Sequence, residues 1–330
     1  MAQAIASVTS VVPSRAVPRG RVTINGSGFD IGDSAEVLLR DVPARISFAS
    51  SHRIVVTIPD DVDGGRMPVR LGGETLGEVE IGSVWATGLH QVDNPAFDRE
   101  GSLFVAYSGS RGQESPVSVF RVTHEGTREP FASGIVNATS MAFGPDDRLY
   151  VSSRFEGAVY RVAPDGTPEQ VASDLGVACG IAFDADGWMY VGDRSGTIFR
   201  VRDGRATAFA TLPASVAAFH LAMSPEGDLY VTAPTLGTYD PIYRIDRQGQ
   251  ISTIATTLGR PQGIAFGPDG MLYVIDALAG SSGLHRMKGD GWFEPVVAGA
   301  ALVGVAFGPV GELVVASNET AYRFEGTGSA

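Results

Sequence analysis

The feature that most constrains the fold is a pattern that the sequence writes six times between residues 94 and 317. Each copy is an apolar run ending in Ala-Phe or Ala-Met, a turn such as Asp-Gly, and a second β-rich run, as in 262–276 (QGIAFGPDGMLYVID). The second residue of the pair recurs at steps of 46, 40, 40, 43 and 41 residues, at Phe97, Phe143, Phe183, Met223, Phe266 and Phe307. A period near 40 residues with strand-type alternation is typical of a β-propeller. The sequence therefore predicts an all-β chain with blades repeated around an axis.

Two further strands complete each predicted repeat. The hairpin is followed by a strand with an aromatic residue and then an arginine, as in 159–162 (VYRV), and by a fourth strand such as 170–174 (QVASD). The arginines recur in register at Arg121, Arg161, Arg200, Arg244, Arg286 and Arg323. A residue found once per blade, away from the axis, is interpreted as a scaffold residue that forms ion pairs or packs its stem. Each repeat is thus predicted to be a four-stranded antiparallel blade that stacks on its neighbours.

The ring is predicted to close with a strand from the start of the propeller. The sixth repeat lacks a fourth strand because the chain ends soon after 321–324, whereas 84–89 (VWATGL) matches the fourth-strand pattern. Pairing of this segment with the last three strands would remove two open sheet edges. We therefore predict a six-bladed propeller over residues 83–326, closed in its last blade by residues 84–89 and followed by a short tail at 327–330.

Residues 1–82 lack the repeat and read as short strands separated by turns. Apolar alternation in 20–29 (GRVTINGSGF) and 53–60 (RIVVTIPD) predicts a half-buried β-sandwich. These segments, with the strand that ends at Pro13, resemble the IPT/TIG immunoglobulin-like domain. The resemblance implies an immunoglobulin fold over residues 1–82, and a fold alone assigns no activity. The linker to the propeller is minimal, so a fixed arrangement of the two domains is expected.

Composition argues against several function classes. The 330 residues carry a net charge of −12, from 25 basic and 37 acidic side chains, which disfavours nucleic-acid binding through a basic face. No run reaches the ~18 apolar residues of a membrane span, and the first residues lack the charged-then-apolar order of a signal peptide. The single cysteine, Cys179, excludes an intramolecular disulfide. These features favour a cytoplasmic protein, or a secreted one if a signal peptide was removed.

The repeat motifs, such as CGIAFDADGWMYVGD at 179–193, resemble the NHL-repeat and SMP-30/gluconolactonase-like superfamily of six-bladed propellers. The resemblance covers residues 83–326 and implies, for catalytic members, one divalent ion in the channel, usually Ca²⁺, held by a Glu, two Asn and an Asp. Oxygen ligands suit such a hard cation. This sequence departs from the pattern, with Asp93-Asn94 in place of the Glu and with Cys179 or Gln262 in place of an Asn. The candidate metal ligands are therefore Asp93, Asn94 and Asp276, with Gln262 as a further oxygen donor.

The candidate site is the end of the channel at which the first strands begin. The residues there differ from blade to blade, whereas the scaffold residues repeat. We predict five ligand-binding residues at this end: Asn94, Thr139, Cys179, Phe219 and Gln262. His220 and Asp93 are the candidate catalytic residues, because an imidazole and a carboxylate exchange protons near neutral pH. Simpler interpretations stay open: Asp193 and Asp276 can cap turns, and Cys179 can be a small buried residue.

Two classes of function stay open at this point. Neutral or apolar channel residues such as Phe219 and Val303 favour binding of a small molecule or a protein partner at the channel mouth. The alternative is metal-assisted hydrolysis of lactones or related esters, in which the ion polarises a carbonyl or activates water. Lyase or isomerase chemistry on the same scaffold is a third possibility. An uncharged rim that exposes Phe155, Tyr239 and Trp292 would favour a protein partner, and the sequence carries no signal of an oligomeric state.

Overall fold

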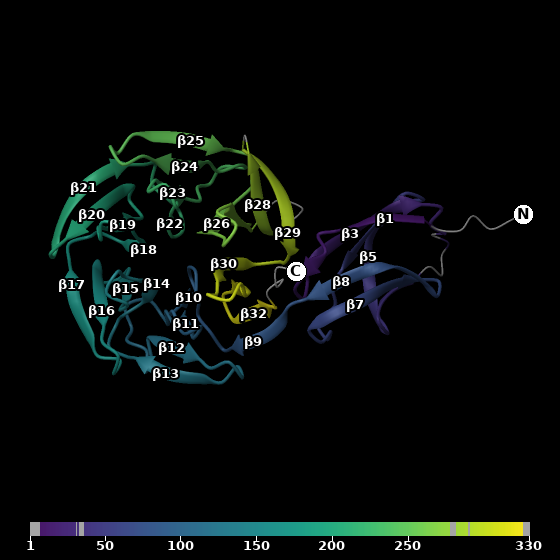
Figure 1. Cartoon of the computed structure of the whole chain (residues 1–330), viewed down its shortest axis with the longest axis horizontal. Coiled ribbons are helices and arrows are strands. Elements are labelled where there is room, and N and C mark those ends of the chain that lie inside the picture. Colours follow the sequence, from purple (N-terminus) through teal and green to yellow (C-terminus); the bar gives the residue numbers. More distant parts are fainter. Residues whose placement is uncertain (1–6, 31, 33–35, 278–281, 290, 326–330) are drawn as a thin grey trace, which may run out of the picture.

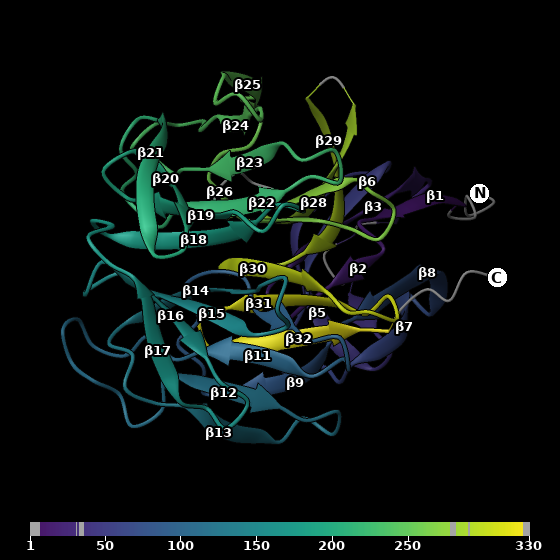
Figure 2. The ribbon, with the colours of Figure 1, turned by 60° about the vertical axis from the view of Figure 1, so that its left-hand side comes forward.

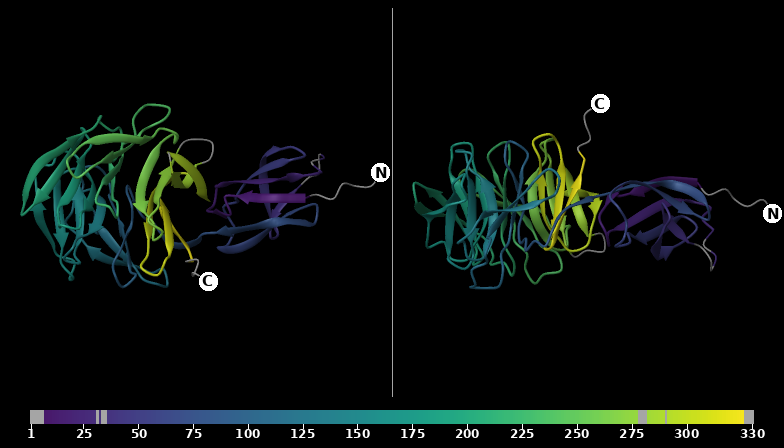
Figure 3. Two further views of the ribbon diagram at one scale, coloured as in Figure 1. Left: turned by 45° about the horizontal axis from the view of Figure 1, so that its top comes forward. Right: turned by 90° about the horizontal axis from the view of Figure 1, so that it is seen from below.

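The computed structural model describes residues 7–30, 32, 36–277, 282–289 and 291–325. A small β-sandwich lies beside a ring of radially arranged sheets (Figure 1). Views from other sides place the sandwich against the rim of the ring, away from its central axis (Figure 3). The prediction of an all-β chain with a propeller is confirmed, and the predicted tail at 327–330 lies outside the described residues. No helix in the described part of the chain has the length and hydropathy that a bilayer crossing requires.

The N-terminal sandwich is built from strands whose side chains alternate between the core and solvent. Val22, Ile24, Ile54 and Val56 occupy alternate positions of two paired strands and are all but completely buried. The strands are β1(Ser7–Val12), β2(Arg15–Ala16), β3(Arg21–Ser27), β4(Val37–Leu39), β5(Val42–Ala49), β6(Arg53–Thr57), β7(Gly65–Leu71) and β8(Glu74–Ile81). They pair in the order β1-β3-β6-β5-β4-β7-β8-β2, and β5 connects the two faces.

Five separate four-stranded sheets form most of the ring within the described residues. The first two are β10(Ala96–Phe97), β11(Leu103–Ala106), β12(Val119–Val122), β13(Arg128–Ala132), and β14(Ala138–Phe143), β15(Leu149–Ser153), β16(Ala158–Val162), β17(Pro168–Ala172). The next two are β18(Ala178–Phe183), β19(Met189–Asp193), β20(Thr197–Arg202), β21(Arg205–Thr211), and β22(His220–Met223), β23(Leu229–Thr232), β24(Ile242–Ile245), β25(Ile251–Ala255). The fifth is β30(Leu302–Phe307), β31(Leu313–Ser317) and β32(Thr320–Phe324), together with β9(Ser83–Thr87).

The remaining four propeller strands do not form a sheet of their own. They are β26(Pro261–Phe266), β27(Leu272–Asp276), β28(Gly283–Gly289) and β29(Trp292–Ala298). They pair in the same up-and-down order as the other blades but continue into the sandwich as one twelve-stranded sheet. The link is β2, which pairs in parallel with β8 on one side and with β29 on the other (Figure 2). The prediction of six blades is met by five separate four-stranded sheets, because backbone pairing joins the remaining four strands to the N-terminal domain in one sheet.

The last sheet is completed by a strand from far earlier in the chain. Strand β9 pairs antiparallel with β32, with Val84 opposite Tyr322 and Thr87 opposite Thr320 (Figure 2). Beyond the strand, the amide of Leu89 donates to the carbonyl of Glu319 at 3.1 Å. Strand β9 thus covers part of the segment expected at 84–89 and lies at the edge of the last sheet.

Aromatic side chains fill the space between neighbouring blades near the ends of the inner strands. The ring from the second strand of one blade meets, edge to face, the repeated phenylalanine of the next blade. The pairs and their centroid distances are Phe104–Phe143 (5.4 Å), Tyr150–Phe183 (4.8 Å), Tyr230–Phe266 (5.1 Å) and Tyr273–Phe307 (4.8 Å). This packing explains why the phenylalanine of the motif recurs in nearly every repeat.

The arginines of the third strands act as scaffold residues. Arg161 pairs with Glu169 at 2.6 Å, and Arg244 pairs with Asp228 at 2.5 Å. Arg200 stacks instead on Trp188, with its guanidinium carbon 3.9 Å from the ring centroid. The predicted scaffold role of the repeated arginine is supported, since these partners all lie in the same blade as the arginine.

Candidate functional site in the propeller channel

The inner strands β10, β14, β18, β22, β26 and β30 surround a channel of about 320 Å³. We call the end at which these strands begin the upper end and the opposite end the lower end. The alanines of the repeated motif line the channel, as expected: Ala142, Ala182, Ala222, Ala265 and Ala306. Larger apolar side chains line it as well, and Asp93, Asn94 and Ser140 supply polar lining. The channel is therefore an apolar tube with polar groups gathered where the inner strands begin.

Glycines let neighbouring inner strands approach closely at the upper end. A Cβ atom added to Gly180 would lie 2.6 Å from the carbonyl oxygen of Phe219, and one added to Gly304 would lie 2.6 Å from that of Asp93. These contacts are too short for any side chain, so glycine is required at both positions. The ring is consequently narrow here, and a polar side chain on one inner strand reaches the strands opposite.

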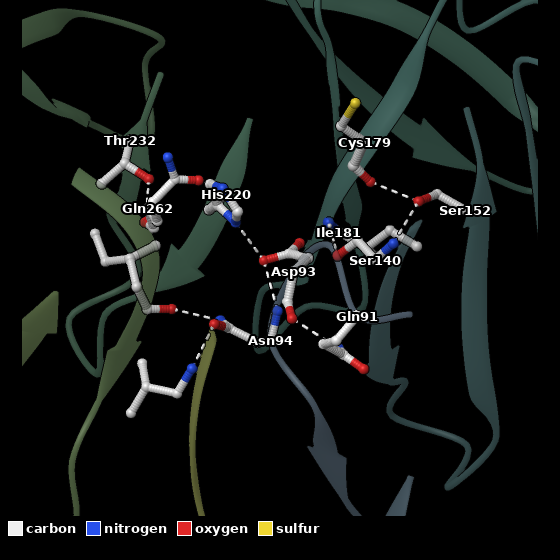
Figure 4. A network of polar contacts seen from close by, with 12 residues as sticks. Gln91, Asp93, Asn94, Ser140, Ser152, Cys179, Ile181, His220, Thr232 and Gln262 are labelled. Carbon is white, nitrogen blue, oxygen red and sulfur yellow. Dashed lines mark hydrogen bonds and ion pairs between the residues drawn. The ribbon is translucent and has the colours of Figure 1, made fainter. Parts of the chain in front are cut away.

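Asp93 and His220 meet at the upper end from opposite sides of the ring (Figure 4). Asp93 precedes β10 and His220 begins β22, so two blades separate them in either direction. Oδ1 of Asp93 lies 2.5 Å from Nδ1 of His220. The exposed fractions are 2% for Asp93 and 0% for His220. The pair thus spans the channel, and the two residues predicted as catalytic are brought into contact.

Asp93 has further hydrogen-bond partners beside His220, whereas the imidazole of His220 has no further partner among the described residues. Oδ1 of Asp93 also accepts from the amide of Asn94 at 2.7 Å, and Nε2 of Gln91 donates to the backbone carbonyl of Asp93 at 2.7 Å. When Asp93 is ionised and the imidazole of His220 is neutral, Nδ1 donates to the carboxylate and Nε2 presents a lone pair. This Nε2 is buried and has no hydrogen-bond partner among the described residues. An unpartnered buried nitrogen opposite a carboxylate anchor is the arrangement of a general base.

The side-chain amide of Asn94 connects two inner strands. Its Nδ2 donates to the carbonyl of Ile264 at 2.8 Å, and its Oδ1 accepts from the amide of Val305 at 3.0 Å. Both polar atoms of the side chain are therefore used by β26 and β30. The prediction that Asn94 supplies a ligand oxygen differs from this arrangement, because the oxygen already serves a backbone amide.

Cys179 belongs to a structural network on the other side of the channel. Oγ of Ser152 donates to the carbonyl of Cys179 at 2.6 Å, and Oγ of Ser140 accepts from the amide of Ile181 at 3.1 Å (Figure 4). The thiol of Cys179 donates to the carbonyl of Val177 at 3.3 Å. Burial raises the pKa of this thiol to about 12, so the thiol stays protonated at neutral pH. The interpretation of Cys179 as a small buried residue is supported over its prediction as a ligand-binding residue.

Two other predicted ligand-binding residues also lie inside the scaffold. Thr139 is fully buried, and its hydroxyl donates to the carbonyl of Asn137 at 2.8 Å. Phe219 is fully buried in a cluster that includes Ile198. Neither side chain is accessible from the channel as the structure stands, and their role in ligand binding stays a prediction.

Gln262 is the predicted ligand-binding residue whose side chain stays partly accessible at the upper end. The backbone carbonyl of Gln262 accepts a hydrogen bond from the hydroxyl of Thr232 at 2.6 Å (Figure 4). Thr232 is the register partner of His220 in the neighbouring strand. No hydrogen bond of the Gln262 side chain occurs among the described residues. Gln262 therefore lies close to the His220 side of the channel with its amide available.

The predicted metal ligands are not assembled. The carboxylate of Asp276 accepts hydrogen bonds from the amides of Arg260 at 2.8 Å and Gly259 at 3.1 Å. These bonds cap a turn, as the simpler interpretation of Asp276 expects. Asp193 accepts from the amide of Val177 at 2.8 Å in the same way. Within the described ranges, no three His, Cys, Asp or Glu side chains converge in a manner suited to a metal. Ca²⁺ takes about six to eight oxygen ligands, so the donor set present here does not fit it.

Sequence reasoning missed an arginine pair at the upper end. Arg154 directly follows β15, and Arg194 directly follows β19, so the two occupy equivalent positions in consecutive blades. The positive charges of both arginines, and the negative charge of Asp93, act on the thiol of Cys179. Burial, with smaller contributions from Arg194 and Arg111, lowers the pKa of Arg154. The signal was available in the repeat, since these positions follow the second strand, but position alone does not show which way a side chain turns.

Comparison with known protein families identifies the domains separately. Residues 6–80 match the IPT/TIG domain, so the sandwich belongs to that domain family. Residues 180–201, across β18 to β20, match the strictosidine synthase-like N-terminal family. No curated protein sequence matches the chain significantly.

Solved structures share the fold at low sequence identity. An auxiliary nutrient binding protein from Bacteroides ovatus is 13% identical with a TM-score of 0.53, and the match covers 97% of each chain. A gluconolactonase from Xanthomonas campestris is 17% identical with a TM-score of 0.57, over 72% of this chain and 87% of that one. Virginiamycin B lyase from Staphylococcus aureus is 14% identical with a TM-score of 0.52, over 72% of this chain and 95% of that one. These likenesses establish the propeller fold and leave the chemistry to the residues of the site.

Proposed function

We propose that this chain is a six-bladed propeller, closed by β9, that binds a small organic molecule at the upper end of its channel. The observation that carries the proposal is the unpartnered Nε2 of His220, held by Asp93 at 2.5 Å on the other side of the imidazole. A buried polar atom without a partner destabilises a protein by about 1–3 kcal/mol. Such an atom at the narrow end of a channel is explained when a ligand supplies the missing hydrogen bond.

The shape of the site supports the same proposal. Ligand sites are concave and mostly apolar, with a few placed polar groups that fix orientation. The channel provides the apolar lining, and Asp93 is one of its polar groups. His220 contacts Asp93, and the hydroxyl of Thr232, the register partner of His220, donates to the backbone carbonyl of Gln262. One structural relative that matches over nearly the whole length is described as a nutrient binding protein, which is consistent with a binding role for this architecture.

A second candidate function is hydrolysis of a lactone or related ester at the same site. The observation that favours it is again the contact between His220 and Asp93, which is the pairing that a general base requires. Nε2 of His220 would take a proton from water while the water oxygen bonds to the carbonyl carbon. The ring C–O bond would then break, and the leaving oxygen would take the proton back from the imidazolium to give a hydroxy acid. A gluconolactonase shares the fold.

The test begins with the molecule that the protein itself retains. Small molecules released by heat from the purified chain are identified by mass spectrometry and titrated calorimetrically into the wild type and His220→Gln. We expect His220→Gln to weaken binding tenfold or more, because glutamine cannot restore the imidazole geometry. His124→Gln is the matched control, since His124 is exposed, and its affinity should stay within twofold. Equal affinity in the folded His220→Gln protein would overturn the proposal.

The two candidate functions separate in a turnover assay. Hydrolysis of a panel of γ- and δ-lactones is followed by proton release at constant pH, with and without added Ca²⁺. A general base contributes about 10²–10⁴-fold to a rate, so His220→Gln would abolish turnover in the hydrolase case. Binding of the retained molecule without turnover of any lactone would favour the binding role.

A further inference from the structure

The upper end of the channel carries arginine side chains that have no counter-ion. Arg154 is half-buried, and Arg194 and Arg111 are exposed. None of the three side chains forms a hydrogen bond or an ion pair with any described residue. This contrasts with the third-strand arginines, of which Arg161 and Arg244 have carboxylate partners.

Chain geometry brings these arginines to one place. The ring of Phe155, next to Arg154, packs on Gly112, next to Arg111, so these two loops touch. The amide of Arg194 donates to the carbonyl of Val177 at 3.2 Å, two residues before Cys179. The positive charges of Arg154 and Arg194 both act to lower the pKa of the Cys179 thiol, so both guanidinium groups lie near it. The three arginines thus come from consecutive blades, with Arg154 and Arg194 near the start of β18 and Arg111 on the loop that touches Phe155.

Two carboxylates close to Arg154 and Arg194 in the chain interact with groups other than these arginines. Asp193 accepts from the amides of Val177 and Ser195 and from the hydroxyl of Ser195. Glu156 lies near the hydroxyl of Tyr160. The chain as a whole carries a net charge of −12, so a group of unpaired positive charges is unusual for it. Clefts lined by charges of one sign concentrate oppositely charged ligands.

We infer that the ligand of the upper end is a small organic anion, whose carboxylate or phosphate group is bound by Arg154 and Arg194. This inference rests on the proposed ligand site and names the chemical class of its ligand. A guanidinium group donates two parallel hydrogen bonds to a carboxylate or phosphate, which gives both affinity and orientation. The anionic group would lie on the arginine side, and the rest of the molecule would extend toward His220.

The experiment compares charged and neutral forms of one sugar. D-Gluconate, D-glucose 6-phosphate, inorganic phosphate and neutral D-glucose are titrated calorimetrically into the full chain at low and at ~300 mM salt. We expect one saturable site for at least one of the three anions, no binding of glucose, and weaker binding at high salt because exposed charges are screened. Binding of gluconate alone would assign a carboxylate ligand, and binding of both phosphates would assign a phosphate ligand.

Variants locate the site. Arg154→Ala/Arg194→Ala should weaken anion binding tenfold or more, and Arg154→Lys/Arg194→Lys should retain part of it because the charges remain. Arg66→Ala/Arg205→Ala removes the same charge from exposed positions without partners and should leave affinity within twofold. No saturable binding of any of these anions, or equal binding by Arg154→Ala/Arg194→Ala, would overturn the inference.

Failure of this inference is distinguishable from failure of the proposed function. If His220→Gln removes binding of the retained molecule and Arg154→Ala/Arg194→Ala does not, the site stands and the anionic class is wrong. If the arginine variant alone removes anion binding, the anionic class stands and the role of His220 is wrong.

Discussion

Nδ1 of His220 lies 2.5 Å from Oδ1 of Asp93, although 127 positions separate the two residues in the chain. The contact joins blades on opposite sides of the ring and is buried from both sides. The contact therefore joins two opposite blades across the axis of the propeller. Most other contacts between blades join neighbouring blades. A functional group placed here is held by the whole ring rather than by one loop.

The first prediction concerns the strength of this contact. Asp93→Ala should lower the free energy of unfolding by about 3–5 kcal/mol, because loss of one partner leaves the other buried and unsatisfied. Chemical denaturation of Asp93→Ala, His220→Ala and the double variant measures the coupling between the two side chains. We expect the double variant to be less destabilised than the sum of the single ones by about 1–3 kcal/mol.

An exposed ion pair provides the control for that cycle. Arg244 and Asp228 also lie 2.5 Å apart, but the arginine side chain is 46% exposed. Exposed pairs contribute at most about 1 kcal/mol, so the same cycle on these residues should show little coupling. A coupling for Asp93 and His220 as small as that of the control would contradict a special role for burial across the axis.

The second prediction concerns metal. Calorimetric titration of the chelator-treated chain with Ca²⁺ should show no single site tighter than about micromolar, because sensor-class sites require several free oxygen ligands. Asp276 and Asn94 already bind backbone amides. One-site binding at or below that affinity, lost in Asp93→Ala, would contradict this expectation and favour the metal-assisted hydrolase.

The third prediction concerns alkaline pH and the single cysteine. The thiol of Cys179 has its pKa raised to about 12 by burial, whereas an unfolded thiol titrates near ~8.5. The unfolded state therefore loses its proton first, and the stabilisation present below pH ~8.5 is lost as pH rises toward 12. The free energy of unfolding should fall by about 1.4 kcal/mol per pH unit over this window through this one group.

The variant Cys179→Ala isolates this contribution from that of the tyrosines. Its unfolding free energy should be lower than that of the wild type at pH 8, and the gap should narrow by about 2 kcal/mol at pH 10, since the variant lacks the thiol. Urea denaturation at the two pH values measures the gap. Parallel pH dependence of the two proteins would show that the buried thiol does not resist ionisation.

The fourth prediction concerns the junction between the two domains. A Cβ atom added to Gly20 would lie 2.3 Å from the carbonyl oxygen of Ala298, so Gly20→Val should separate β2 from β29. In calorimetry we expect one unfolding transition for the wild type and two for the variant, with the sandwich melting first. Gly32→Ala, where an added Cβ atom would meet only Oδ1 of Asp30 at 3.6 Å, should keep a single transition. Two transitions in the wild type would contradict coupling through the shared sheet.

The repeat determined much of the fold, because its period and alternation depend on local chain geometry. The channel position of Ala182 follows from the spacing of the motif, and so does the packing of Phe183 between blades. The β9 segment was found because its sequence matches a missing strand. The pairing of β2 with β29 was not found, since two residues in an extended backbone leave no pattern in the sequence.

The sequence indicates some residues of the candidate site and not others. His220 stood out because glycine is usual at its position, and Asp93 stood out at the start of the first repeat. Thr139 and Phe219 are predicted to face the channel because they share one register position, whereas both side chains are fully buried in the structure. The role of Arg154 depends on the direction of its side chain and on which carboxylates lie nearby, and neither is encoded by spacing.

The sequence by itself determined the architecture: a sandwich, a repeated four-stranded unit and a closing strand, all of which follow from local hydrophobic periodicity and turn chemistry. The tertiary structure alone decided which polar groups meet. The contact between Asp93 and His220 and the gathering of Arg154 with Arg194 depend on how the ring closes. Closure sets distances between residues that are remote in the chain, and no short-range pattern records such distances.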